Sequence, residues 1–140
     1  MKVPNILRRL AEDRGGAAII EMAAALPVLV TMFCGIVEYG TLFSLHHAVQ
    51  QSANEGARAA LAGLSQPERF DIAEKVSRTM LGSSLAAKAR DIQTSTADDG
   101  QLLTVTVTYD ASRHPLLDLP MVPRPYTSIE RRASVRLTGL

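Results

Sequence analysis

The 140-residue sequence contains one cysteine, no tryptophan and few other aromatic residues. A lone cysteine excludes an intramolecular disulfide, and the place of Cys34 in an apolar run indicates a small buried hydrophobe. An excess of either charge is also missing, because 15 Lys and Arg stand against 14 Asp and Glu, a net charge of +1. This balance provides no basic surface to follow nucleic-acid phosphates, so no nucleic-acid partner is expected.

The motifs of common enzymes and metal sites are missing as well. The sequence has no glycine-rich phosphate loop, nucleophile elbow or clustered carboxylate pair. His46 and His47 are adjacent, so on a helix they point about 100° apart and do not form the i, i+4 pair of a zinc helix. We therefore expect two solvated surface histidines, no metal, no cofactor, no small-molecule substrate and no enzymatic activity.

What the sequence does have is one long apolar run behind a short charged leader. The leader, residues 1–16, is rich in basic side chains. Residues 17–45 follow as one predicted helix, which is roughly 40 Å long at about 1.5 Å per residue, and a hydrocarbon core is about 30 Å thick. A single transmembrane helix is the favoured interpretation. The basic leader predicts a cytoplasmic N-terminus and an exported domain at residues 46–140.

Other interpretations of the run stay open. A secretory signal peptide needs a small-x-small cleavage site directly after its apolar region, and none is present. A lipoprotein signal would acylate Cys34, but the bulky Phe33 stands at the cut. A buried helix of a soluble protein also remains, because Pro27, Glu21 and many alanines lower the average hydrophobicity.

Glu21 is a carboxylate near the start of the apolar run. At membrane depth a carboxylate costs about 3 kcal/mol, so such a residue usually has a partner or a function. Gly15 and Gly16 admit the extended backbone that a protease needs. A cut between Gly16 and Ala17 would place a new ammonium four residues before Glu21, on the same helix face. The spacing predicts a processing site at Gly16 and Ala17 and charge pairing during assembly at Glu21, and a carboxylate at headgroup level is the alternative.

Helical periodicity continues beyond the span. The first helix is predicted to extend to about Ala62, with small residues that let another element pack closely. Its apolar and small face comprises Leu42, Leu45, Val49, Ala53, Gly56, Ala57, Ala60, Leu61 and Leu64. A capping box from Ser65 to Glu68 begins a second helix that ends at Gly82. The buried stripe of that helix is predicted to be Phe70, Ala73, Val76, Met80 and Leu81.

Period-two alternation predicts strands in the last third of the chain. Residues 103–109 alternate apolar side chains with threonines, and a weaker strand at 91–97 precedes them across a turn at 98–100. A third strand is predicted at 129–137. The fold class is therefore α+β, with a long N-terminal transmembrane helix extended into an exported domain that has a second helix and a short antiparallel sheet of about three strands.

Two features of this region break the strand pattern. Arg131 interrupts the apolar, inward-facing set of the third strand. Residues 114–126 contain four prolines among aliphatic residues, which excludes a helix or central strand. This segment is interpreted as a packed loop, with a partner contact as the alternative.

The order of several motifs resembles a known family. Gly16, Glu21, the pair Leu26-Pro27 and the segment Gly35-Ile36-Val37-Glu38-Tyr39-Gly40 stand in the order found in the TadE-like minor pilins of tight-adherence pilus systems. Met22 occupies a position that is usually aromatic in these pilins. The resemblance extends more loosely through residues 51–63 and 105–110.

This resemblance implies a minor pilin or pseudopilin of a type IV pilus that is cleaved by a prepilin peptidase. It implies a function in pilus assembly, adhesion and biofilm formation, with other pilins, an inner-membrane assembly platform and membrane lipid as partners. The implied location is the bacterial inner membrane, with the surface pilus as a second location. An uncleaved single-span protein whose exported domain binds an envelope partner is the alternative.

Overall fold

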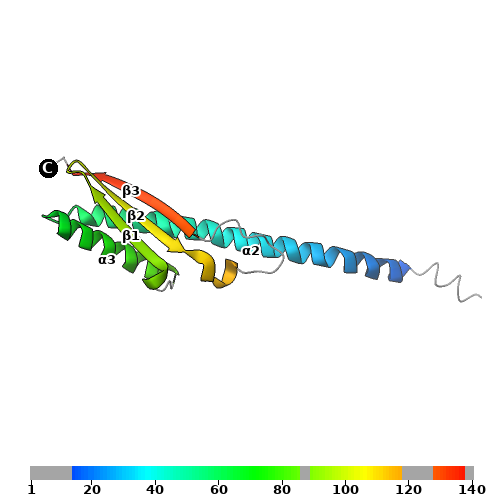
Figure 1. Ribbon diagram of the computed structural model, residues 1–140. Coiled ribbons are helices and arrows are strands. Elements are labelled where there is room, and N and C mark those ends of the chain that lie inside the picture. Colours follow the sequence, from blue (N-terminus) through cyan, green and yellow to red (C-terminus); the bar gives the residue numbers. More distant parts are fainter. Residues whose placement is uncertain (1–13, 86–88, 118–127, 138–140) are drawn as a thin grey trace, which may run out of the picture. The chain divides into compact units, whose positions relative to one another are not determined.

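A computed structural model describes residues 14–85, 89–117 and 128–137. Most of the leader, residues 1–16, and most of the proline-rich segment, residues 114–126, lie outside the described residues. The elements follow one another in the order shown in Figure 1: α2 (Arg14–Ala60), α3 (Gln66–Leu85), η1 (Ala89–Asp91), β1 (Ile92–Asp98), β2 (Leu102–Asp110), η2 (Ala111–Arg113), η3 (Pro115–Leu117) and β3 (Ser128–Arg136). The predicted α+β fold class is confirmed.

The chain divides into two compact units, residues 1–36 and 37–140. In the first unit, the described residues form the opening part of α2, and no side chain from residue 16 to residue 36 is buried. The helix begins at Arg14, three residues before the predicted start, so Gly15 and Gly16 are helical. Glycine opposes a helix by only about 1 kcal/mol per residue, which does not prevent this extension.

In the second unit, α2 buries one face. The buried positions recur at three- and four-residue spacings and include Leu42, Leu45, Val49, Ser52, Ala53, Gly56, Ala57 and Ala60. Leu61 and Leu64 were predicted to continue this face, but both are exposed, and Leu64 is 94% exposed. Because the helix ends at Ala60, the two leucines leave its periodicity and lie at the turn toward α3.

The second helix, α3, begins at Gln66, directly after the predicted cap residue Ser65, but its contacts differ from those of a capping box. Glu68 Oε2 accepts a hydrogen bond from the Leu64 backbone N–H at 2.9 Å, and the Ser65 carbonyl accepts one from the Arg69 N–H at 2.9 Å. The predicted end at Gly82 is wrong, because α3 continues to Leu85. Leu85 packs against the buried core, so burial beyond Gly82 offsets the low helix propensity of glycine.

Helices α2 and α3 approach each other closely at Gly56. A Cβ atom at this position would overlap Ser77 Oγ and lie 3.1 Å from the Ala73 carbonyl oxygen. The buried Ser77 hydroxyl donates to the Ser52 carbonyl at 3.1 Å, so this polar group at the helix contact is satisfied. The prediction that small residues allow close packing is confirmed.

The sheet has the antiparallel order β1-β2-β3. Ile92 is opposite Tyr109 in the first pair of strands, and Leu103 is opposite Val135 in the second. The predicted inward-facing residues of β2 are all buried: Leu103, Val105, Val107 and Tyr109. They form one core cluster with the buried faces of α2 and α3.

The predicted turn at residues 98–100 joins β1 to β2. Gly100 has a φ of 85°, a left-handed conformation that glycine adopts without strain. Asp98 Oδ1 accepts from the Gly100 N–H at 2.8 Å, and Asp99 Oδ1 accepts from the Gln101 and Leu102 N–H groups at 2.9 and 2.6 Å. Both aspartates therefore satisfy backbone donors in the turn.

Candidate functional site

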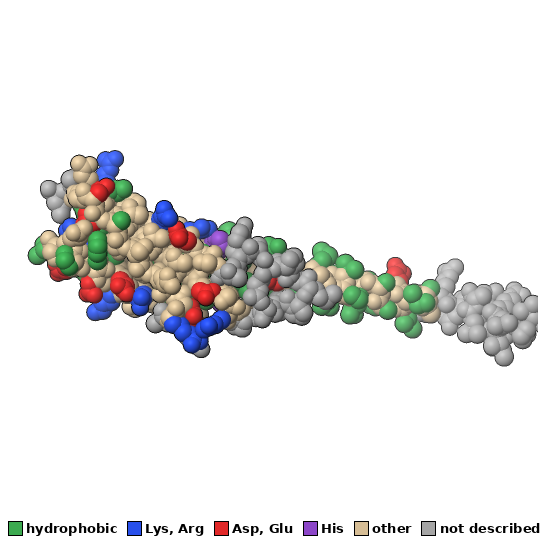
Figure 2. All heavy atoms as spheres, in the orientation of Figure 1, with side chains coloured by type: hydrophobic (Ala, Val, Ile, Leu, Met, Phe, Trp, Pro, Cys, Tyr) green, Lys and Arg blue, Asp and Glu red, His purple; other side chains and the backbone are tan. Residues whose placement is uncertain are grey.

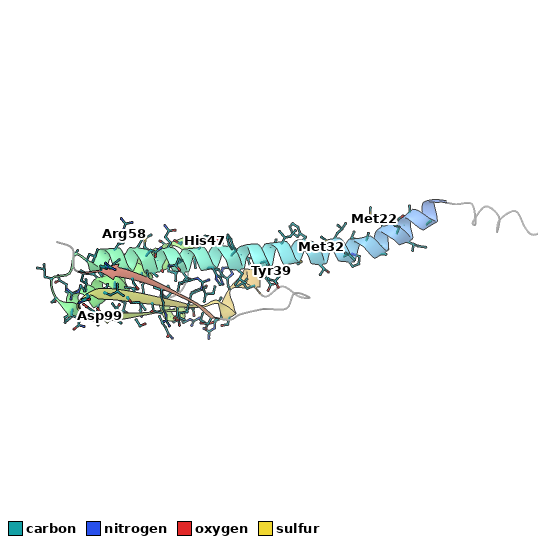
Figure 3. All side chains as sticks on the ribbon, turned by 90° about the horizontal axis from the view of Figure 1, so that it is seen from above. Met22, Met32, Tyr39, His47, Arg58 and Asp99 are labelled. Carbon is teal, nitrogen blue, oxygen red and sulfur yellow. The ribbon has the colours of Figure 1, made fainter. Side chains whose placement is uncertain are left out.

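The first candidate site is the apolar surface of α2. Its helix is long and apolar enough from Gly16 onward to cross a membrane, and the most apolar part of it is not buried in the protein. Figure 2 shows hydrophobic side chains spread along this part of the chain, and Met22 and Met32 both project from the helix in Figure 3. So much exposed apolar surface requires a partner or a lipid environment.

The hydroxyl groups on this stretch are compatible with such an environment. Thr31 Oγ1 donates to the Pro27 carbonyl oxygen at 2.8 Å, and Thr41 Oγ1 donates to the Val37 carbonyl oxygen at 2.7 Å. Each hydroxyl is thus satisfied within its own helix. In hydrocarbon, where no water is present, unsatisfied polar groups cost several kcal/mol each.

The residues predicted for processing and charge pairing lie together in the first turns of α2. Gly16, Ala17 and Glu21 are all exposed, and Ala17 and Glu21 are four residues apart on one helix face. A Cβ atom built on Gly16 would meet nothing within 4 Å. Glu21 has no hydrogen bond or ion pair within the described part of the chain. Its carboxylate is therefore available to a cation from outside the described residues.

A second carboxylate on the same helix has the opposite environment. Glu38 is only 2% exposed, and neither carboxylate oxygen has a hydrogen-bond partner among the residues that the structure describes. Sequence reasoning missed this burial. The signal that could have found it is the spacing, because positions 38, 42, 45 and 49 form one continuous helical face.

The two adjacent histidines also have different environments. His47 is exposed, as predicted, and its ring meets the Phe43 ring edge-on with centroids 4.6 Å apart. The prediction of a solvated His46 is wrong. Arg131 Nη2 donates to His46 Nδ1, and burial followed by the charge of Arg131 lowers the pKa of this histidine. The signal was Arg131 itself, since an arginine on the inward face of β3 requires an acceptor there.

These side chains border a shallow hollow of about 340 Å³, lined by Phe43, His46, His47, Gln50 and Arg131. Gln50 Nε2 also donates to the Arg132 carbonyl at 3.2 Å, so α2 and β3 are joined beside the hollow. In the described ranges, no three His, Cys, Asp or Glu side chains come together as a metal site. The hollow can therefore bind a polar group next to the Phe43 ring.

A charged contact ties α3 to the turn between β1 and β2. Arg69 donates from Nε at 2.9 Å and from Nη2 at 2.7 Å to Asp98 Oδ2. The Asp98 side chain is 2% exposed. Hydrogen bonds from the Gly100 N–H and then from Arg69 lower the pKa of Asp98. We call this pair the Arg69–Asp98 clasp, and its contacts indicate a structural role.

Comparison with known proteins addresses the apolar helix directly. Residues 16–58 match the family model described as TadE-like protein, so the match begins at Gly16 and includes Glu21 and the segment from Gly35 to Gly40. The chain has no match among curated proteins or among solved structures. The family is a structural one associated with pili, and an N-terminal apolar helix fits a protein associated with a tight-adherence pilus. The chain therefore carries a TadE-like domain at residues 16–58.

Proposed function

We propose that this protein is a minor pilin or pseudopilin of a tight-adherence pilus. The observation that supports this most strongly is the exposed apolar surface of α2 in a TadE-like segment that begins at Gly16. A helix with this surface inserts in the bacterial inner membrane as a single span. The remaining part of the chain then acts as a small exported domain in pilus assembly, adhesion and biofilm formation.

The proposed topology follows from the charged leader. Basic side chains stay on the cytoplasmic side, so the N-terminus is cytoplasmic and the domain is exported. A reporter that is active only outside the cytoplasm, fused after Gly139, tests this orientation. Its inactivity, together with activity of a cytoplasmic reporter at the same position, would reverse the topology.

In the proposed pathway a prepilin peptidase cuts the bond between Gly16 and Ala17. The exposed position of both residues in the first turns of α2 supports this, because the first turn of a helix has backbone N–H groups without helical partners and is the easiest to unwind. Other pilins and an inner-membrane assembly platform then receive the mature chain, whose new ammonium lies four residues before Glu21.

The decisive experiment is the intact mass and N-terminal residue of protein purified from native membranes. The expected mature chain begins at Ala17. Gly16→Val should leave the chain uncut. Because a Cβ at Gly16 meets nothing within 4 Å, this failure would not be caused by misfolding. Gly35→Val is the matched control, since Gly35 is equally unobstructed, and it should be cut normally.

The alternative is an uncleaved single-span protein whose exported domain binds an envelope partner. Wild-type protein that still begins at residue 1, in cells whose peptidase processes other pilins, would favour this alternative. Membrane insertion would then stand, and the pilin function would be refuted.

A further inference from the structure

The hollow beside Arg131 lies close to the place where the apolar run of α2 ends. If the hydrocarbon layer begins near Met22, about 20 helical residues cross its roughly 30 Å and reach Thr41. The headgroup layer adds about 5 to 7 Å on each side, which is about three to five further residues of helix. Phe43 falls within this second interval, and His46 lies at its outer edge.

The exposed aromatic residues on this part of the helix agree with that depth. Phe43 is 67% exposed and Tyr39 is 53% exposed, and Figure 3 labels Tyr39 and His47 along α2. Aromatic rings are favoured at the boundary between hydrocarbon and water. The aromatic side of the hollow can therefore contact acyl chains while its polar side faces the headgroups.

The polar side of the hollow has more hydrogen-bond donors than acceptors. A guanidinium has five N–H donors, and the described contacts of Arg131 use two, to the Glu130 carbonyl at 3.0 Å and to His46 Nδ1. Since His46 Nδ1 accepts this bond, the hydrogen of the neutral ring is on Nε2, which is buried without a partner among the described residues. No described carboxylate forms an ion pair with Arg131.

We propose that the hollow formed by Phe43, His46, His47, Gln50 and Arg131, here named the headgroup site, binds the phosphate of a membrane phospholipid. Arg131 supplies the charge and the planar donor set that suits a phosphate, and the Phe43 ring covers the first part of the acyl chains. A protein carboxylate or free phosphate would satisfy the donors but leave the exposed Phe43 ring uncovered. The inference rests on the proposed insertion of α2 in a membrane.

A direct contact between the guanidinium and a lipid phosphate tests the site. Full-length protein with ¹⁵N-labelled arginine is placed in bilayers of phosphatidylcholine and phosphatidylglycerol, and dephasing of the arginine nitrogens by ³¹P is measured by solid-state NMR. The leader arginines Arg8, Arg9 and Arg14 also lie near lipid, so the expected result is a loss of part of the guanidinium dephasing in Arg131→Ala, while the part from the leader stays. Arg132→Ala is the matched control, because Arg132 is the next residue on β3, is exposed and pairs with Glu130. It should keep the signal.

A second measurement covers the case in which Arg131→Ala fails to fold. Native mass spectrometry of the wild type, Arg131→Lys and Arg132→Ala counts phospholipids retained after detergent extraction. Arg131→Lys keeps the charge but loses the planar donor set, so retention should fall several-fold, while Arg132→Ala should match the wild type. Equal retention in all three proteins would overturn the proposal.

Two further outcomes identify a different ligand. In phosphate-free detergent without phospholipid, added inorganic phosphate should not dephase Arg131, and dephasing would mean that the site binds free phosphate. Absence of a ³¹P contact to Arg131, combined with loss of a co-purifying pilin in Arg131→Ala, would mean that the site binds a protein partner. Either result refutes the headgroup site.

Insertion is scored separately by alkaline carbonate extraction. Protein released by carbonate would refute membrane insertion and with it the proposed function. Protein that resists carbonate but shows no ³¹P contact to Arg131 would refute the headgroup site alone.

Discussion

The two parts of α2 share one backbone conformation and have opposite surroundings. From residue 16 to residue 36 no side chain is buried, whereas from Leu42 to Ala60 one face is buried against α3 and the sheet. Apart from Glu21, the first part has apolar side chains on all sides, and the second part is apolar on one side only. A helix that is apolar all round is typical of a lipid or deeply buried environment, and an amphipathic one of a protein surface. The first part of α2 is therefore suited to a lipid environment, and the second part is suited to packing on a folded domain.

The two carboxylates on the helix show the same contrast. Glu21 is exposed on the part without protein contacts, and Glu38 is buried where the second unit begins. We expect a change of charge in the first part to affect assembly with partners, and a change in the second part to affect the stability of the folded domain. The predictions below separate these two effects.

The largest effect is expected at Glu21. Glu21→Gln keeps the size of the side chain and removes its charge, so insertion and cleavage should continue while co-assembly with other pilins is lost. Surface fibres and co-purification with pilins measure this loss in an otherwise intact strain. Glu55→Gln, on the second part of α2, is the control and should assemble normally. Normal fibres from Glu21→Gln would show that this carboxylate has no role in assembly.

Leu45 tests the second part of the helix. This residue is 1% exposed, so Leu45→Ala should lower the free energy of unfolding of the domain by about 2–5 kcal/mol. Leu29→Ala removes the same atoms from an exposed position and should leave domain unfolding unchanged. Chemical denaturation in detergent, followed by circular dichroism, gives both values. Similar losses in the two variants would show that the two parts are not energetically separate.

Gly56 tests how closely the second part packs. An added Cβ overlaps Ser77 Oγ, so Gly56→Ala should destabilise the domain by about 1–3 kcal/mol. Gly40→Ala meets nothing within 4 Å and should stabilise the helix by up to about 1 kcal/mol. The two alanine substitutions are therefore expected to have opposite signs. Gly56→Ala combined with Ser77→Ala should recover part of the loss, which a change in helix propensity alone would not produce.

The smallest effect concerns the Arg69–Asp98 clasp and acid. The folded-state pKa of Asp98 lies below its unfolded value, so the associated stability is present above about pH 4 and is lost as the pH falls further. Between about pH 5 and pH 2, the melting temperature of Asp98→Asn should fall less than that of the wild type, but it should still fall. Hydrogen bonds also lower the pKa values of Asp99 and Asp110. These two residues should therefore still make the melting temperature fall with pH in the Asp98→Asn variant. An equal fall of the melting temperature in both proteins would exclude a contribution of the Arg69–Asp98 clasp to the acid dependence of stability.

Much of the fold could be predicted because local pattern and burial agree. The alternation in β2 determined its buried face correctly, and the Asp-Asp-Gly sequence marked the turn before it. Helix ends were less predictable. Leu64 has the right spacing to continue a buried face, but the chain turns before it, and Gly82 stays helical because Leu85 reaches the core. Tertiary packing determines such ends, and spacing along the chain does not contain that information.

The candidate site also has one part that could be predicted from the sequence and one part that could not. The segment from Gly16 to Glu21 is local, so its motif could be recognised from the sequence. The contact of His46 with Arg131 joins residues 85 positions apart, and it depends on which residue of β3 faces which turn of α2. Neither histidine spacing nor strand alternation specifies that register. In the sequence, Arg131 stood out only because it interrupts the apolar alternation of the third strand.

Pro27 lies inside the exposed part of α2 and limits how this part can exist outside lipid. Proline has no N–H, so the helix lacks the bond to the Ala23 carbonyl, and the segment from Gly16 to Leu26 is held to the following turns by fewer hydrogen bonds. That segment is shorter than the roughly 12–15 residues that an isolated helix needs in water. In water, this segment therefore needs contact with another helix to keep its helical form. Under the proposed function, extraction from the membrane and docking on a neighbouring subunit would be thermodynamically linked, and a chain released without a neighbour would unwind at this end first.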